Sequence, residues 1–373
     1  MTRAMLALLL ILGNVPAAEA ARRRAVQPPA SPPAAIVTAA TQAAQSLLTA
    51  GVPAVQVAVS KRGHIIYADA FGVLDKESAT AATPRSVLQI ASITKEFTAA
   101  AILRLAERGA LSLDDPIDRY VPDFDSRGVT ITLRHLLTHT SGISRDWYAA
   151  TSNGLAPPGP VTREQTMASL NKKPFDFLPG KKWSYSDAGY MLLGYAIESI
   201  TGMSYAESIQ REIVLPLGLI DTGVCGTYNL SPLQGYGLLG GTWKHMPPPH
   251  WSVMLSNGAL CSTASDLVRW SHLLANGKVL LPASYETMTT PARLDDGNVV
   301  SSGYALGIAV ANMLGRSAVW HSGAIDGFQS YLVYFPAEEL AVAVIINAFP
   351  VGPGANPQSM AMAVANAALA PQQ

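Results

Sequence analysis

Strand-like segments lie at both ends of the 373-residue chain, with a mainly helical stretch between them. Near the N-terminus, valines alternate along residues 52–60, and a turn at 61–63 leads into a second strand at 65–71. Near the C-terminus, strands are expected at 304–310, 318–321, 329–335 and 340–347. Joining both ends into one antiparallel sheet predicts an α/β (α+β) fold, with a ligand groove between the sheet and the inserted part.

Two terminal helices are expected to cover this sheet. The first spans 34–49 and ends at Gly51, and the second begins at Asn356–Pro357, a cap followed by proline at the first helical position. The predicted division of the chain is a signal peptide at 1–20, a proline-rich linker at 21–35, a sheet domain formed by 36–91 and 291–373, and an inserted mainly helical domain at 92–290.

The first twenty residues are typical of a signal peptide. Arg3 gives a positive start, Ala4–Gly13 is an apolar run too short to span a bilayer, and Ala18–Ala20 matches a cleavage pattern. An uncleaved, buried helix is the alternative, and the arginines at 22–24 oppose export. We expect an exported protein, periplasmic or secreted, without a membrane span after cleavage.

Composition narrows the classes of partner. Lys+Arg and Asp+Glu both total 26, so no basic field exists to hold nucleic acid. Export would place Cys225 and Cys261 in an oxidising compartment, where one disulfide and two separate buried thiols remain equally open. His245 and His250 flank a run of prolines without further converging ligands, so we expect no metal and no cofactor.

Two S-x-x-K tetrapeptides occur, Ser92–Lys95 and Ser169–Lys172. On a helix such residues share a face, so the lysine amine can reach the serine hydroxyl and, when buried, act as its base. Ser92 opens a long apolar helix, where a lysine without a role would be costly. Ser169 closes a short polar segment, and we predict that Ser169 and Lys172 are surface residues. A helix cap beside a solvated lysine is the alternative for Ser92.

Two further segments could complete a catalytic site. Tyr185–Asp187 precedes an apolar helix at 188–200, so the tyrosine phenol can enter a groove and shuttle a proton, while Asp187 also suits the helix N-cap. His321–Ala324 ends a strand. Gly323 would let a substrate backbone approach closely. The Ala324 amide could join the Ser92 amide in an oxyanion hole.

In this order the three segments resemble the penicillin-recognising serine enzymes, which include class C β-lactamases, D-alanyl-D-alanine carboxypeptidases, D-aminopeptidases and related family VIII-like esterases. Their pattern is S-x-x-K, then Y-x-N, then K/H-[TS]-G. The flanking residues 136–142, 257–267 and 345–347 agree with the resemblance, which covers about residues 36–350. It implies a β-lactamase/transpeptidase-like, penicillin-binding-protein fold.

The resemblance also implies roles for single residues. Ser92 would be the acylated nucleophile, Lys95 its base, and Tyr185 a relay of protons to the leaving group and the deacylating water. The amides of Ser92 and Ala324 would form the oxyanion hole. The substrate-binding residues would be Asp187, His321, Ser322, Gly323 and Asn347.

Two departures from the family pattern shape the expected activity. Asp187 replaces asparagine and, when ionised, cannot donate a hydrogen bond to the substrate. His321 replaces lysine and would hold an acidic or polar substrate end less firmly. The sequence therefore favours a hydrolase of esters or D-amino-acid peptides, with β-lactams as weaker substrates. A class C-like β-lactamase and a non-catalytic penicillin or peptidoglycan sensor are the alternatives, and the oligomeric state stays open.

Overall fold

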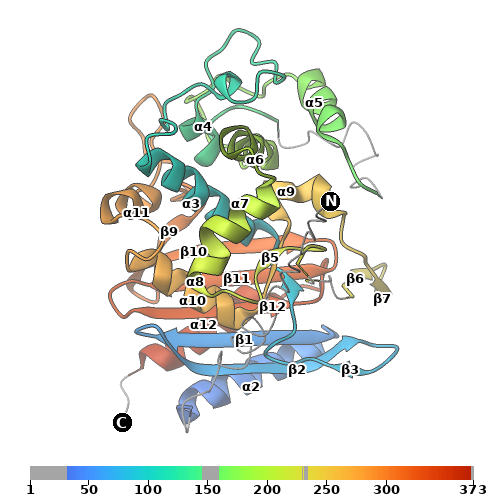
Figure 1. Cartoon of the computed structure of the whole chain (residues 1–373). Helices are drawn as coiled ribbons and strands as arrows, with labels where there is room; N and C mark the ends of the chain where they lie inside the picture. Colours follow the sequence, from blue (N-terminus) through green and yellow to red (C-terminus); the bar gives the residue numbers. More distant parts are fainter. Residues whose placement is uncertain (1–31, 145–158, 229, 231–233, 371–373) are drawn as a thin grey trace, which may run out of the picture.

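The computed structural model describes residues 32–144, 159–228, 230 and 234–370 (Figure 1). The predicted signal peptide and most of the predicted linker lie outside these residues. The first described helix, α2 (Ala34–Thr49), agrees with the helix expected at 34–49 and overlaps the last two residues assigned to the linker.

A seven-stranded antiparallel sheet joins the two ends of the chain, as the strand pattern predicts, in the order β3-β2-β1-β12-β11-β10-β9. Its central pair is β1 with β12, and Val57 lies opposite Val344. The strands are β1 (Ala54–Lys61), β2 (His64–Asp75), β3 (Thr80–Ala81), β9 (Ala309–Met313), β10 (Arg316–Ile325), β11 (Phe328–Phe335) and β12 (Leu340–Ile346).

Helices cover both faces of this sheet. The terminal helices α2 and α12 (Pro357–Leu369) pack together on one face, and α10 (Ala264–Ala275) packs on the other (Figure 1). In β1, Val57 faces the terminal helices while Ala58 belongs to the core on the opposite side. Strands that are buried on both faces carry nearly continuous apolar runs, which explains why the sequence of β12 shows no alternation.

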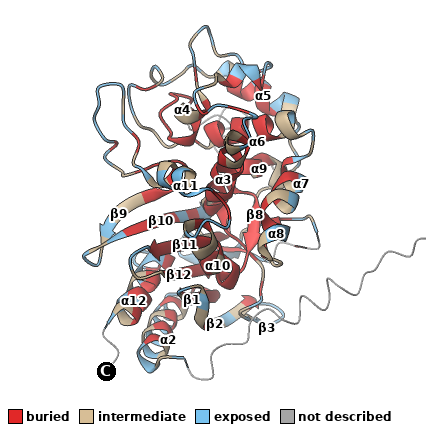
Figure 2. Ribbon diagram, turned by 60° about the vertical axis from the view of Figure 1, so that its left-hand side comes forward, coloured by how far each residue is buried: buried red, intermediate tan, exposed pale blue. Residues whose placement is uncertain are grey.

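In sequence, a mainly helical part lies between the N-terminal and the C-terminal strands of the sheet, and in space it lies to one side of the sheet (Figure 1). At its centre is α3 (Thr94–Glu107), of which residues 94–103 are all buried (Figure 2). The other helices are α4 (Leu133–Leu137), α5 (Arg163–Lys172), α6 (Asp187–Thr201), α7 (Tyr205–Ile209), α8 (Leu215–Leu217), α9 (Trp251–Gly258) and α11 (Pro282–Thr289), with the short turns η1 (Ala91–Ile93), η2 (Ile117–Arg119) and η3 (Gln210–Val214). Two small sheets are formed by β4 (Leu88–Gln89), β8 (Leu260–Ser262) and β5 (Gly223–Val224), and by β6 (Tyr236–Leu239) and β7 (Thr242–His245).

Two local features resolve or correct sequence expectations. Cys225 and Cys261 form a disulfide, which ties the segment after β5 to β8. The strand expected at 304–310 is instead a buried loop that includes Gly307 at φ +76°, and β9 begins only at Ala309. In the described part of the chain, no helix combines the length and apolar character needed to cross a bilayer.

Candidate active site

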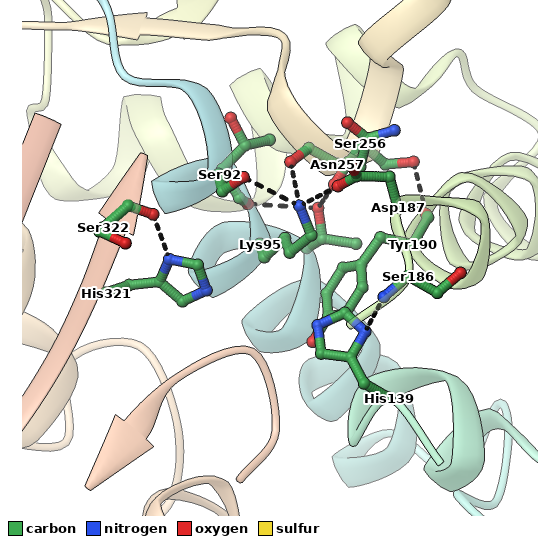
Figure 3. Close-up of polar contacts among 12 residues, drawn as sticks. Ser92, Lys95, His139, Ser186, Asp187, Tyr190, Ser256, Asn257, His321 and Ser322 are labelled. Atoms are coloured by element: carbon green, nitrogen blue, oxygen red, sulfur yellow. Dashed lines mark hydrogen bonds and ion pairs between the residues drawn. The ribbon is translucent and has the colours of Figure 1, made fainter. Parts of the chain in front are cut away.

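Ser92 and Lys95 lie where the turn η1 leads into α3, and the structure brings their side chains together. The Lys95 side chain is fully buried, yet its amine donates to Ser92 Oγ at 3.2 Å, to Asp187 Oδ1 at 2.6 Å and to the Asn257 carbonyl oxygen at 2.8 Å (Figure 3). These acceptors match the three hydrogens of an ammonium group. The buried charge is thus compensated while one hydrogen points at the candidate nucleophile.

The backbone around Ser92 is fixed by strands from distant parts of the sequence. Ser330 Oγ donates to the Ile90 carbonyl oxygen at 2.7 Å from β11. From the adjoining β10, Gly323 packs so closely that an added Cβ would lie 2.2 Å from that same oxygen. A glycine is therefore needed at 323 to admit the backbone of Ile90. The contact of Gly323 with a substrate backbone, expected from the sequence, stays a prediction.

Ala324 is the residue after Gly323 in β10. β9 pairs with β10 only as far as Trp320, so within the described residues the corresponding side of β10 at 321–325 has no strand partner. β10 packs on the turn η1, which carries Ser92, with Gly323 against Ile90. The arrangement is compatible with an oxyanion hole formed by the Ser92 and Ala324 amides. Ser322 is exposed and remains available to a substrate.

Asp187 is the first residue of α6, and its carboxylate pairs with Lys95. Asp187 also suited the N-cap position in the sequence, but Ser186 takes that position and no side chain caps the helix. A carboxylate at a helix N-terminus is favourably placed in the helix dipole, and here it also neutralises the lysine. Before it can act as a base, the Lys95 amine must release one of the hydrogens that it donates.

His139, which the sequence analysis did not single out, holds both sides of Tyr185. Its carbonyl oxygen accepts from the Ser184 N–H at 3.0 Å, and its Nδ1 accepts from the Ser186 N–H at 3.2 Å. Its ring lies 4.2 Å from the Tyr185 ring, centroid to centroid. Burial, and next the charge of Lys95, lower the pKa of His139 well below the usual value, so the ring is neutral. In the sequence, this role is indicated only by the segment 136–142, which contains His139 and agrees with the family resemblance.

His321 is buried and neutral, because burial and then the Lys95 charge lower its pKa to about 3. Nδ1 lies 2.6 Å from the Ser322 carbonyl oxygen, which can only accept, so Nδ1 carries the hydrogen. Nε2 therefore accepts from the Tyr304 hydroxyl at 3.0 Å. Both ring nitrogens are engaged, and the expected grip on an acidic substrate end is not provided by this residue.

Asn347 does not contact the site, contrary to the expectation that it binds substrate. Its side chain is fully buried, with Oδ1 accepting from the Ala54 N–H at 2.8 Å. Its Nδ2 donates to the Leu74 carbonyl oxygen at 3.0 Å and to that of Gln234 at 3.2 Å. Asn347 therefore ties β12 to its neighbours, and no hydrogen-bonding atom is left for a ligand.

The second S-x-x-K copy lies on α5, at the edge of the helical part (Figure 1). Lys172 is exposed, as predicted, whereas Ser169 is buried and the prediction of a surface serine is wrong. Ser169 is buried together with Thr166, Met167 and Leu170, and it shares a helix face with Thr166, three residues earlier. An exposed lysine lacks the buried surroundings that Lys95 has.

A cavity of about 160 Å³ is lined on one side by Tyr185, whose ring centroid lies 4.8 Å from Lys95 Nζ. Its lining is rich in aromatic side chains and comes from three segments, of which the one at 302–309 was marked by no motif in the sequence: Trp183, Tyr185, Ser302, Tyr304, Ala309, Trp320, His321 and Ser322. Among the residues that the structure describes, no three His, Cys, Asp or Glu side chains are grouped as a metal site would require.

Comparisons with known proteins place this geometry in a family. Penicillin-binding protein 4* of Bacillus subtilis is 31% identical over 300 residues, which are 75% of this chain and 64% of that protein. The chain spans only 60–64% of the length of the first three curated relatives. An octameric penicillin-binding protein homologue from Pyrococcus abyssi superposes with a TM-score of 0.78 at 30% identity, over 90% of this chain and 77% of that one.

A D-stereospecific amidohydrolase from Streptomyces sp. superposes with a TM-score of 0.74 at 26% identity, over 90% of this chain and 99% of that one. The Beta-lactamase family model matches residues 34–367, nearly all of the described chain. Together with the three ordered motifs and the buried Ser92–Lys95 pair, these similarities show that the chain belongs to the Beta-lactamase family, whose fold and site are those of serine hydrolases.

Proposed function

We propose that this protein is a serine hydrolase that forms an acyl-enzyme on Ser92 and cleaves esters or D-amino-acid amides and peptides. The observation that carries the proposal is the buried Lys95 amine, 3.2 Å from Ser92 Oγ and held by Asp187 and the Asn257 carbonyl. A lysine buried this deeply would destabilise the fold unless its charge is paired, and its retention is explained if its amine takes part in catalysis.

In this mechanism Ser92 Oγ attacks the substrate carbonyl carbon, and its proton passes to the deprotonated amine of Lys95. The negative charge on the carbonyl oxygen is held by the Ser92 and Ala324 amides. The proton then passes, through Lys95 and Tyr185, to the leaving group, which departs and leaves an ester on Ser92. Water attacks this ester along the reverse proton path and frees the enzyme.

Asp187 and His321 favour esters and D-amino-acid amides or peptides as substrates over β-lactams. Asp187 accepts a hydrogen bond from Lys95 and cannot donate one to a substrate amide carbonyl while it is ionised. His321 is neutral and supplies no positive charge for a carboxylate. The similarity to the D-stereospecific amidohydrolase from Streptomyces sp. supports amide substrates of D-configuration.

We also propose that the protein is exported. Its support is the buried disulfide Cys225–Cys261, a bond that persists in oxidising compartments and is rare in the cytosol. N-terminal sequencing of the native protein outside the cytoplasm should begin at or near Ala21. Recovery of only the full-length chain from the cytosol would reject export and leave the hydrolase proposal untouched.

The two S-x-x-K copies provide a matched test of the hydrolase proposal. Ser92→Ala should lower kcat for p-nitrophenyl acetate by at least about a thousandfold, because only binding and oxyanion effects remain. Ser169→Ala should stay within about twofold of the wild type, as expected away from the site. Equal losses would reject the assignment. Stable acylation of the wild type without turnover would favour the non-catalytic sensor.

A further inference from the structure

Tryptophan and tyrosine make up half of the residues that line the cavity next to Tyr185. Trp183, Tyr304 and Trp320 supply aromatic surface, and Ala309 closes one side with a methyl group. Tyr185 forms a further wall. In the proposed mechanism Tyr185 passes a proton to the leaving group, so the cavity lies on the leaving-group side of the scissile bond.

Its size matches one small ring. The cavity measures about 160 Å³, and an apolar protein cavity of roughly 150 Å³ is known to accommodate benzene. Burial of a phenyl-sized group against aromatic walls is favoured both by removal of apolar surface from water and by ring-to-ring contacts. The cavity is therefore large enough for a phenyl group.

None of the described residues that line the cavity carries a positive charge. His321, the one lining residue that could carry a charge near neutral pH, has its Nδ1 on the Ser322 carbonyl and its Nε2 on the Tyr304 hydroxyl. Lys95 is the neighbouring cation, but it is fully buried and paired with Asp187. A carboxylate placed among these walls would lose its hydration without gaining a charged partner.

From the volume, the aromatic lining and the engaged His321 ring, we propose that the cavity is a leaving-group pocket for an uncharged, phenyl-sized substituent and that it disfavours leaving groups with a carboxylate. The inference rests on the proposed function and narrows it, toward esters or amides with neutral leaving groups and away from carboxypeptidase substrates.

The test separates binding in the pocket from turnover. With Ser92→Ala protein, tryptophan fluorescence follows the binding of phenyl acetate and of 4-carboxyphenyl acetate, because two indoles line the cavity. Phenyl acetate should bind at least tenfold more tightly. Ala309→Leu in the same background should weaken phenyl acetate binding by at least tenfold, since the added carbons fill the pocket. Equal binding of the two esters, or no effect of Ala309→Leu, would overturn the proposal.

A charge introduced at the pocket mouth gives the second measurement. Ser302 lines the cavity and is partly exposed, whereas its neighbour Ser301 is exposed and is not part of the lining. Ser302→Lys should raise the kcat/KM ratio of 4-carboxyphenyl acetate to phenyl acetate at least tenfold, and Ser301→Lys should leave it within twofold. Comparison between variants cancels the different intrinsic reactivities of the esters. Equal ratios in both variants would contradict the pocket.

The two experiments distinguish failure of the hydrolase proposal from failure of the pocket proposal. If the wild type cleaves neither ester but Ser92→Ala still prefers phenyl acetate, the hydrolase proposal fails and the pocket stands. If the wild type forms an acyl-enzyme but neither variant changes the selectivity, the hydrolase proposal stands and the pocket inference fails.

Discussion

The ion pair between Lys95 and Asp187 should be strongly coupled, because one partner is fully buried and the other is 33% exposed. At the observed 2.6 Å separation, two unit charges in an effective dielectric of about 20 attract each other by about 6 kcal/mol. Partial hydration of Asp187 reduces this value, and its replacement by asparagine leaves a neutral acceptor in place. Removal of one partner of a buried pair typically costs about 3–5 kcal/mol, so we expect a coupling of about 2–3 kcal/mol.

A double-mutant cycle measures this coupling. Urea unfolding at pH 7 gives the free energy of unfolding for the wild type, Asp187→Asn, Lys95→Met and the double variant. Asp187→Asn should cost about 3 kcal/mol when Lys95 is present and less than about 1 kcal/mol in the Lys95→Met background. A lost helix cap does not contribute to the measured change in the free energy of unfolding, because Asp187 is not the N-cap residue of α6.

The exposed pair Lys181–Asp295 serves as the control. Its atoms are 3.1 Å apart, but its side chains are 57% and 49% exposed. Asp295→Asn should therefore cost no more than about 0.5 kcal/mol, as is usual for surface pairs. A Lys95–Asp187 coupling below about 0.5 kcal/mol would refute the reasoning, because groups other than Asp187 would then compensate the buried charge of Lys95.

Three further predictions concern residues around the site. Burial raises the pKa of Glu96 to about 8, while its carboxyl accepts from Trp270 Nε1 at 2.8 Å. As the pH rises from about 4.5 to 8, the unfolded chain loses this proton and the folded one keeps it, so the free energy of unfolding should fall, by up to about 5 kcal/mol. Glu96→Gln should flatten this dependence in urea unfolding at pH 5 and pH 9, and an unchanged slope would contradict it. Replacement of both Cys225 and Cys261 by serine should lower the free energy of unfolding by about 4 kcal/mol, from the 36-residue separation; a loss under about 1 kcal/mol would show that the bond is dispensable. Gly323→Ala should lower kcat more than tenfold, because an added Cβ would lie 2.2 Å from a backbone oxygen beside Ser92, whereas Gly159→Ala, where it meets nothing within 4 Å, should leave kcat unchanged.

The sheet and its terminal helices could be predicted from the sequence because their signals are local. Alternating or continuous apolar runs mark β1 and β12, and the Asn356–Pro357 pair marks the start of α12, where Asn356 Oδ1 accepts from the Ser359 N–H. The strand expected at 304–310 failed for a tertiary reason. Its apolar side chains are buried in a loop, and Gly307 at φ +76° lets the backbone leave the extended conformation.

The site was predictable only in part. The long apolar helix distinguished Ser92 from Ser169, and the structure agrees that Lys95 is buried and Lys172 exposed. The roles of Asp187 and Asn347 depend on partners far away in sequence, at separations of 92 and 293 residues. A single sequence does not reveal such contacts, and the aromatic cavity escaped notice for the same reason, because its walls come from separate segments.

The central claim is that Ser92 becomes acylated during turnover, and intact mass spectrometry tests it most directly. Wild-type protein, Ser92→Ala and Ser169→Ala are mixed with phenyl acetate, quenched in acid within the first turnovers and weighed. We predict an increase by one acetyl group in the wild type and in Ser169→Ala, mapped to the peptide that contains Ser92, and no increase in Ser92→Ala. An adduct that persists in Ser92→Ala, or that maps to another residue in the wild type, would contradict the account.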